Sequence, residues 1–206
     1  MHVLLINGSP HKEGCTYTAL HEVAFQLKKH RIESTIFHIG NGPVRGCIGC
    51  GKCKGKGLCV FGDDSVNECI ALTREADAIV LGSPVHYASA AGASSAFFDR
   101  MFYAAGGGFA LKPGAAVVSC RRGGASATFD QLNKYFTISQ MPVVSSKYWN
   151  SVHGNTPDEV RQDLEGMQVM RTLGDNLAWL LNCIDAAKDT VQKPEREAPV
   201  KTNFIR

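Results

Sequence analysis

The chain has 206 residues, 44% of them hydrophobic and 20% charged, which is typical of a single globular domain. Its formal net charge of +3 is too small to indicate nucleic-acid binding. No apolar run reaches the roughly 20 residues that a membrane span requires. The N-terminal stretch M-H-V-L-L-I-N-G-S-P lacks the features of a signal peptide. We therefore expect a cytoplasmic protein with no nucleic-acid or membrane partner.

Strands and helices are predicted to alternate along the chain. Short, mostly apolar segments predict strands at 2–7, 32–39, 76–84, 114–120 and 141–149. Amphipathic spacing predicts helices at 16–29, 65–75, 93–103, 128–139 and in one long segment from 156 to about 184. Ser65 and Glu68 have the spacing of a capping box at the start of the second helix, and Thr156 followed by Pro157 marks the start of the last one.

This alternation, without internal repeat or linker, predicts an α/β domain with a five-stranded parallel sheet and helices on both faces. We assign residues 1–187 to this domain, with an insertion at 40–63. The polar tail, 188–206, is expected to be disordered or to strap onto a neighbouring subunit. Because ligands bind at the carboxyl ends of the strands in such sheets, the loops after the first, third and fourth strands are the candidate sites.

The loop after the first strand, G-S-P-H-K-E-G-C-T-Y-T (8–18), leads into the start of a helix. Free N–H groups at a helix N-terminus favour an anion, and the hydroxyls of Ser9, Thr16 and Thr18 would add donors. The dinucleotide fingerprint is absent. A P-loop, G-x-x-x-x-G-K-[ST], is excluded for two reasons. Gly8 and Gly14 are one residue too far apart for it, and Cys15 stands where the motif has lysine. The loop predicts a phosphate cradle without an obligatory lysine; the alternative is a plain turn capped by Thr16.

The loops after the third and fourth strands contain groups that could contact a flat heterocycle. G-S-P-V-H-Y (82–87) places aromatic rings and backbone amides at the sheet edge. S-C-R-R-G-G-A-S (119–126) contains glycines that let the backbone approach a ligand closely.

Half of the eight cysteines lie in R-G-C-I-G-C-G-K-C-K-G-K-G-L-C (45–59): Cys47, Cys50, Cys53 and Cys59. The C-x2-C-x2-C spacing lets one loop bind three corners of a [4Fe–4S] cluster, with a fourth ligand nearby. A structural zinc site usually separates its C-x2-C pairs by a longer span. A loop of thiols that holds no metal is a further alternative, while disulfides are disfavoured in a reducing compartment. Cys69, Cys120 and Cys183 are expected to be buried apolar side chains.

Several motifs together resemble the NADPH-dependent FMN reductase branch of the flavodoxin-like superfamily. They are G-S-P-x-x-x-G-x-T in the first loop, G-S-P-V-x-Y after the third strand and F-F-D-R at 97–100. With the four-cysteine motif, F-A-L-K-P (109–113) and E-G-M-Q (165–168), the chain more closely resembles the iron–sulfur flavoproteins, from residue 1 to about 185.

The resemblance implies a flavodoxin-like three-layer sandwich with strand order 2-1-3-4-5 and FMN bound at the strand ends. It assigns the FMN phosphate to Ser9, His11, Gly14, Cys15, Thr16 and Thr18. It implies that the isoalloxazine ring is lined by Pro84, Val85, His86 and Tyr87. The third side of the FMN site would be closed by Arg121, Gly123 and Gly124. Two residues depart from the pattern: relatives commonly carry Asn or Ser in place of Cys15, and Tyr in place of His86.

FMN would supply the redox chemistry, so no protein side chain is assigned a catalytic role. The function implied is an NAD(P)H oxidoreductase that passes electrons to a quinone, flavin or similar acceptor. The alternative is an electron carrier between ferredoxin-like partners, with FMN and a [4Fe–4S] cluster held by Cys47, Cys50, Cys53 and Cys59. A third interpretation is a redox-sensing binding module that uses the thiols. The resemblance also implies a homodimer or homotetramer.

Overall fold

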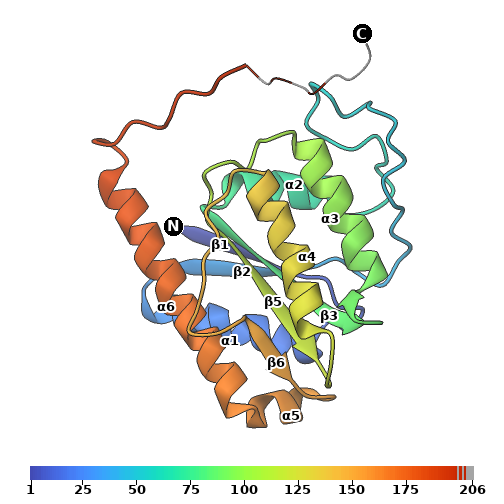
Figure 1. Cartoon of the computed structure of the whole chain (residues 1–206), viewed down its shortest axis with the longest axis vertical. Coiled ribbons are helices and arrows are strands. Elements are labelled where there is room, and N and C mark those ends of the chain that lie inside the picture. The colour runs from blue at the N-terminus through green and yellow to red at the C-terminus, as the bar shows by residue number, and fades with distance from the viewer. Residues whose placement is uncertain (199, 201, 203–206) are drawn as a thin grey trace.

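The computed structural model describes residues 1–198, 200 and 202, and its central sheet carries helices on both faces (Figure 1). Five strands run parallel in the order β2-β1-β3-β5-β6, and β4 pairs antiparallel with the end of β3. The strands are β1 (His2–Asn7), β2 (Glu33–His38), β3 (Ala78–His86), β4 (Ser89–Ala90), β5 (Gly114–Cys120) and β6 (Ser151–His153). Apart from the short β4 and the position of the fifth strand along the chain, this is the predicted parallel sheet in the predicted order.

The helices divide between the two faces and enclose two separate cores. One face carries α1 (Cys15–Lys29), α5 (Pro157–Gln162) and α6 (Leu164–Ala187), and the other carries α2 (Val66–Glu75), α3 (Gly92–Ala105) and α4 (Ala125–Ile138). In β1, Val3 and Leu5 pack into the first core and Leu4 and Ile6 into the second, since successive side chains of a strand point to opposite faces. All four are fully buried, which explains the continuous apolar run.

The predicted fifth strand at 141–149 is wrong. Of this segment only Val143 forms a bridge, to Gly114 at the start of β5. A strand cannot continue there because Pro142 has no N–H to donate, and Ser146 turns the chain by accepting from the N–H of Tyr148 at 3.3 Å. The chain rejoins the sheet only at β6, next to the end of β5.

The single long helix predicted from Thr156 is two helices. Thr156 does cap α5, since its hydroxyl accepts from the N–H of Glu159 at 3.2 Å. The chain then breaks at Asp163, whose backbone (φ −73, ψ 79) is not helical. The carboxylate of Asp163 accepts from the N–H of Gly166 at 2.9 Å and so starts α6 anew.

The capping box predicted at Ser65 and Glu68 is also wrong. The hydroxyl of Ser65 donates to the carbonyl of Ile39 at 3.3 Å and does not cap α2. Instead, Asp64 Oδ1 accepts from the N–H of Val66 at 3.2 Å. The Asp64 carboxylate also binds Arg100, as described below.

The segment between β2 and α2 contains neither helix nor strand over residues 39–65, which is where the insertion 40–63 was predicted. It lies beside α3 at the edge of the molecule (Figure 1). The predicted tail begins directly after α6, and its described residues 192–198 are exposed and lack helix or strand. Residues 199, 201 and 203–206 of that prediction lie outside the described residues. None of the helices in the described part of the chain is long and apolar enough to cross a membrane.

Candidate functional site

The loop between β1 and α1 is shaped by Asn7, the fully buried last residue of β1. Its Oδ1 accepts from the N–H of Ser9 and its Nδ2 donates to the carbonyl of Lys12, both at 3.0 Å. Ser9 Oγ accepts in turn from the N–H of His11 at 3.0 Å. Asn7 therefore folds the loop into consecutive tight turns. Sequence reasoning missed this residue, although an Asn directly before G-S-P at a strand end is a turn signal.

A second missed residue braces the same loop from outside. His38, the last residue of β2, donates from Nε2 to the carbonyl of Ser9 at 2.8 Å. The loop is thus tied to a neighbouring strand as well as to β1. No sequence motif marks His38, because its partner lies 29 positions away along the chain.

Helix α1 starts at the end of this loop with free donors. Gly14 is its N-cap, no side chain of the described residues caps it, and its first turn contains no acidic residue. The first N–H groups of a helix lack intrahelical acceptors and carry partial positive charge. The start of α1 is therefore suited to an anion such as a phosphate. A Cβ on Gly14 would lie 2.8 Å from the Cβ of His11, so this turn requires glycine.

The predicted phosphate residues all lie in this loop or in the first turn of α1, but several of their side chains have partners within the protein. The hydroxyl of Thr18 donates to the carbonyl of Gly14 at 3.1 Å. Thr16 Oγ1 lies 2.8 Å from Ser119 Oγ and connects α1 to β5. Burial raises the pKa of the Cys15 thiol, which keeps it neutral. The backbone amides are therefore the main donors that this loop offers to a phosphate.

The loop after β3 forms a tight hairpin with β4. Val85 pairs with Ala90 and His86 with Ser89, which leaves Tyr87 and Ala88 as a two-residue turn. Both turn residues have positive φ (50 and 57), a conformation that non-glycine residues rarely adopt. His86 is exposed, and the Tyr87 side chain is fully exposed at 105%. Of the predicted ring-binding residues, only Pro84 and Val85 are partly covered by the chain itself.

The loop after β5 packs against this hairpin. Gly124 has a φ of 91, and a Cβ there would lie 2.8 Å from Val85 Cγ1. Arg121, Arg122 and Gly123 are exposed at the same edge. The first loop is joined to this group through β3, since the N–H of Gly8 donates to the carbonyl of Gly82 at 2.8 Å. The three predicted loops therefore lie side by side at the carboxyl ends of β1, β3 and β5.

These features fit FMN. The start of α1 offers amides to a phosphate, while the β3–β4 hairpin and the glycine-rich loop after β5 offer backbone and partly apolar groups to a flat ring. No lysine is needed in the cradle, because uncapped amides and the helix dipole supply the positive field.

The four clustered cysteines share one narrow, mostly apolar pocket between the insertion and α3. Its walls include Ile48, Phe61, Arg100 and Tyr103 besides Cys47, Cys50, Cys53 and Cys59. All eight cysteines are free thiols. Of the three predicted to be buried, Cys69 and Cys120 are, whereas Cys183 is exposed because it lies on the outer face of α6.

In the part of the chain that the structure describes, no three Cys, His, Asp or Glu side chains are arranged to hold a metal ion. The four thiols match an iron–sulfur cluster in ligand type and line one pocket, so they are the residues that would hold one. The structure thus brings the predicted ligands to one place without forming a closed coordination site.

Arg100 of α3 lines this pocket and is only 1% exposed. Its Nε donates to the Sγ of Cys59 at 3.2 Å, and its two terminal nitrogens bind both carboxylate oxygens of Asp64. Burial lowers the pKa of the guanidinium. Asp64 and the Cys59 sulfur together raise this pKa by more than burial lowers it, so the net pKa lies above its ordinary value. Arg100 is the last residue of the F-F-D-R motif, whose structural role could not be read from the sequence.

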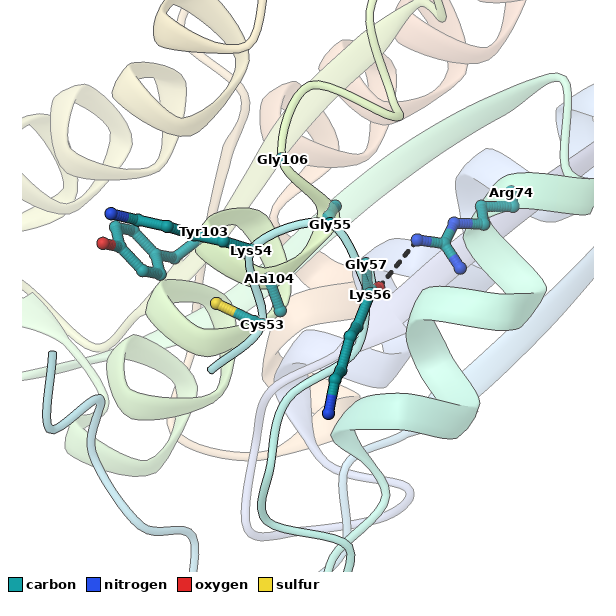
Figure 2. A pocket seen from close by; sticks show the side chains of 10 residues that line it. Cys53, Lys54, Gly55, Lys56, Gly57, Arg74, Tyr103, Ala104 and Gly106 are labelled. Carbon is teal, nitrogen blue, oxygen red and sulfur yellow. Dashed lines mark hydrogen bonds between the residues drawn. The ribbon is translucent and has the colours of Figure 1, made fainter. Parts of the chain in front are cut away.

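A second, basic pocket of about 510 Å³ shares Cys53 and Tyr103 with the first. Lys54 and Tyr103 both line this pocket, and Figure 2 shows Arg74 pointing at the turn around Gly57. Arg74 donates to the carbonyl of Gly57 at 2.7 Å. Lys54, Lys56 and Arg74 therefore line the same pocket as Cys53.

Comparison with protein families matches residues 1–156 to the model described as NADPH-dependent FMN reductase. An iron–sulfur flavoprotein of Methanocaldococcus jannaschii is 32% identical over 193 residues, which cover 89% of this chain and 99% of the relative. An iron–sulfur flavoprotein of Methanosarcina thermophila is 30% identical over 194 residues, covering 92% of this chain and 100% of the relative.

Among solved structures, RosB with a bound flavin-derived intermediate has a TM-score of 0.69 at 12% identity, covering 100% of this chain and 94% of that one. A flavodoxin from the domain Archaea has a TM-score of 0.58 at 15% identity, covering 88% of this chain and 99% of that one. At these identities the likeness establishes the fold, which is flavodoxin-like.

Proposed function

Since the chain belongs to the NADPH-dependent FMN reductase family, we propose that this FMN flavoprotein takes electrons from NAD(P)H and delivers them to a quinone, flavin or similar small acceptor. The observation that carries the proposal is the uncapped start of α1 beside two glycine-containing loops at the same sheet edge. FMN, when bound, supplies the hydride and electron transfer that protein side chains cannot provide.

The chain's own residues bind and orient in this proposal. Asn7 and His38 keep the loop amides aimed at the phosphate. Gly124 lets the loop after β5 lie against the β3–β4 hairpin, so that both reach one ring. The exposed Arg121 at this edge is a cation that can face the phosphates of a nicotinamide nucleotide or a carbonyl of the acceptor.

Steady-state assays of the FMN-loaded chain test the proposal. Under anaerobic conditions we expect NADPH or NADH oxidation to require both FMN and an added quinone or flavin. FMN-loaded protein that oxidises neither nucleotide with any such acceptor would overturn the enzymatic proposal.

The second candidate is an electron carrier with FMN and a [4Fe–4S] cluster that serves ferredoxin-like partners. The specific observation in its favour is that Cys47, Cys50, Cys53 and Cys59 line one pocket. The basic residues around Cys53 would suit an acidic redox partner. The relatives in Methanocaldococcus jannaschii and Methanosarcina thermophila are named iron–sulfur flavoproteins.

Anaerobic purification separates the two candidates. About four irons per chain with slow nucleotide oxidation would favour the carrier. An iron-free yellow protein with rapid NAD(P)H-dependent acceptor reduction would favour the enzyme.

We also propose that residues 1–187 act as the FMN-binding domain and assemble as a homodimer or homotetramer. Large aromatic side chains support an assembly: Tyr148 is 58% exposed, Trp149 54% and Trp179 68%. Sedimentation of the purified chain measures the oligomeric state, and a monomer at micromolar concentration would rule the assembly out.

A further inference from the structure

Cys59 is held by side-chain hydrogen bonds to both its backbone and its sulfur. Asn67 accepts from the Cys59 N–H at 2.8 Å and donates to its carbonyl at 3.0 Å, so the backbone is clamped on both sides. Arg100 Nε adds a hydrogen bond to the sulfur itself. By contrast, Cys47 and Cys50 are exposed, on a stretch without regular structure.

The guanidinium of Arg100 also joins the two ends of the insertion. Nη1 donates to the carbonyl of Arg45 at 3.4 Å, before the first cysteine, and Nη2 donates to the carbonyl of Phe61 at 3.3 Å, after the last. The Phe61 ring lies 5.2 Å from the Arg100 carbon Cζ, within cation–π range. A lysine could not replace these contacts, because they use the planar arrangement of several N–H groups.

Asp64 fixes the orientation of this fork. The carboxylate binds both terminal nitrogens of Arg100 and, through Oδ1, accepts from the N–H at the start of α2. The ion pair is largely buried, with side chains 1% and 10% exposed. A buried cation is thereby aimed at a sulfur rather than at solvent.

We propose that Arg100 is the positioning residue of the four-cysteine segment. It fixes Cys59 before any cluster is present, and it keeps a positive charge and a hydrogen bond on that sulfur once a cluster is held. The second statement, the redox half of the proposal, rests on the electron-carrier candidate. The first statement, that Arg100 orders the segment without a cluster, is the ordering half and does not rest on it. The donor set fits a cluster, and hydrogen bonds to its sulfurs are among the features that set a cluster's potential.

The test uses three variants of the full chain. Arg100→Met combined with Asp64→Asn removes the fork without leaving an unpaired buried carboxylate. Arg100→Lys keeps the charge but loses the fork. Arg74→Gln is the matched control, because Arg74 bonds the same segment from α2 but does not contact a sulfur. Circular dichroism establishes that each variant is folded.

Hydrogen exchange on the iron-free protein measures the ordering. We expect amides within 45–64 to exchange at least about tenfold faster in the double variant and in Arg100→Lys. Arg74→Gln should change exchange only around Gly57. Wild-type exchange throughout 45–64 in the folded double variant would overturn the proposal.

Redox titration after anaerobic reconstitution measures the effect on the sulfur. The double variant should bind less iron or show a more negative cluster potential, while Arg100→Lys retains a potential closer to wild type and Arg74→Gln matches wild type. A loaded double variant with the wild-type potential would overturn the redox half. If wild-type protein takes up no iron, the electron-carrier candidate and the redox half fail together, and exchange alone decides the ordering half.

Discussion

Gly124 lies so close to Ala88 that a Cβ on the glycine would stand 2.6 Å from the Ala88 Cα. This contact joins the loop after β5 to the β3–β4 hairpin, whose turn is formed by Tyr87 and Ala88. Two of the three loops proposed to hold FMN can therefore pack this closely only because residue 124 has no side chain.

Gly124→Ala should destabilise the protein by about 1–3 kcal/mol, because alanine disfavours the positive φ of 91 and meets the hairpin. FMN affinity should fall at least about tenfold, since the two loops can no longer approach. Thermal unfolding and FMN titration measure the two effects. Gly62→Ala is the control: Gly62 lies outside the three loops and a Cβ there meets nothing within 4 Å, so both values should stay close to wild type.

His38→Ala removes the hydrogen bond from β2 to the Ser9 carbonyl. The first loop loses its outside brace, and we expect the FMN dissociation constant to rise about 2- to 10-fold, as for the loss of one net hydrogen bond. His2→Ala is the control, because His2 bonds Thr35 between the same two strands, toward their N-terminal ends. Equal losses in the two variants would contradict a specific role for His38.

Alkylation of the iron-free protein should divide the cysteines by exposure and thiolate character. Cys47, Cys50 and Cys183 are exposed and should react within minutes at mildly alkaline pH. Cys69 should stay protected until unfolding, because burial raises its pKa to about 12. Peptide mass spectrometry identifies the labelled sites. Fast labelling of Cys69 in the folded protein would contradict its burial, and protection of all four loop thiols after reconstitution would indicate a bound cluster.

Asp175 gives the contact between α1 and α6 a pH dependence. Partial burial raises the pKa of this carboxyl, but hydrogen bonds from Gln26 and His30 lower it more, so the net pKa lies below its usual 3.8. Its stabilisation is therefore complete above the unfolded-state pKa and is lost as pH falls through the lower folded-state pKa. The contribution is modest, because the side chain is 47% exposed.

Asp175→Asn should reduce the loss of thermal stability between about pH 5 and pH 2. Asp185→Asn, in an exposed pair with Lys188 on the same helix, should keep the wild-type acid dependence. An unchanged acid dependence in Asp175→Asn would contradict the assignment.

The sequence predicted the sheet wherever one strand is a continuous apolar run, as in β1 and β5. It missed β6 because that strand has only three residues with Val152 as its one buried apolar side chain, whereas the nearby run at 141–144 looks more like a strand. Periodicity likewise could not reveal the break at Asp163, since apolar positions keep helical spacing on both sides of it.

The candidate site was predicted as far as its motifs are local. The loops at 8–18, 82–87 and 119–126 do lie together, because parallel strands end at one edge. The contact between Arg100 and Cys59 could not be predicted, because the two residues are 41 positions apart and no spacing rule connects them. Side chains that support a site through long-range contacts require the folded structure.

Equilibrium titration with FMN, followed by quenching of flavin fluorescence, tests whether the three loops form one flavin site. Wild-type protein and Gly62→Ala should bind one FMN per chain at micromolar concentration or tighter, and Gly124→Ala should bind at least about tenfold more weakly. A wild-type chain that takes up no FMN, or a folded Gly124→Ala variant that binds it as tightly as wild type, would contradict this site.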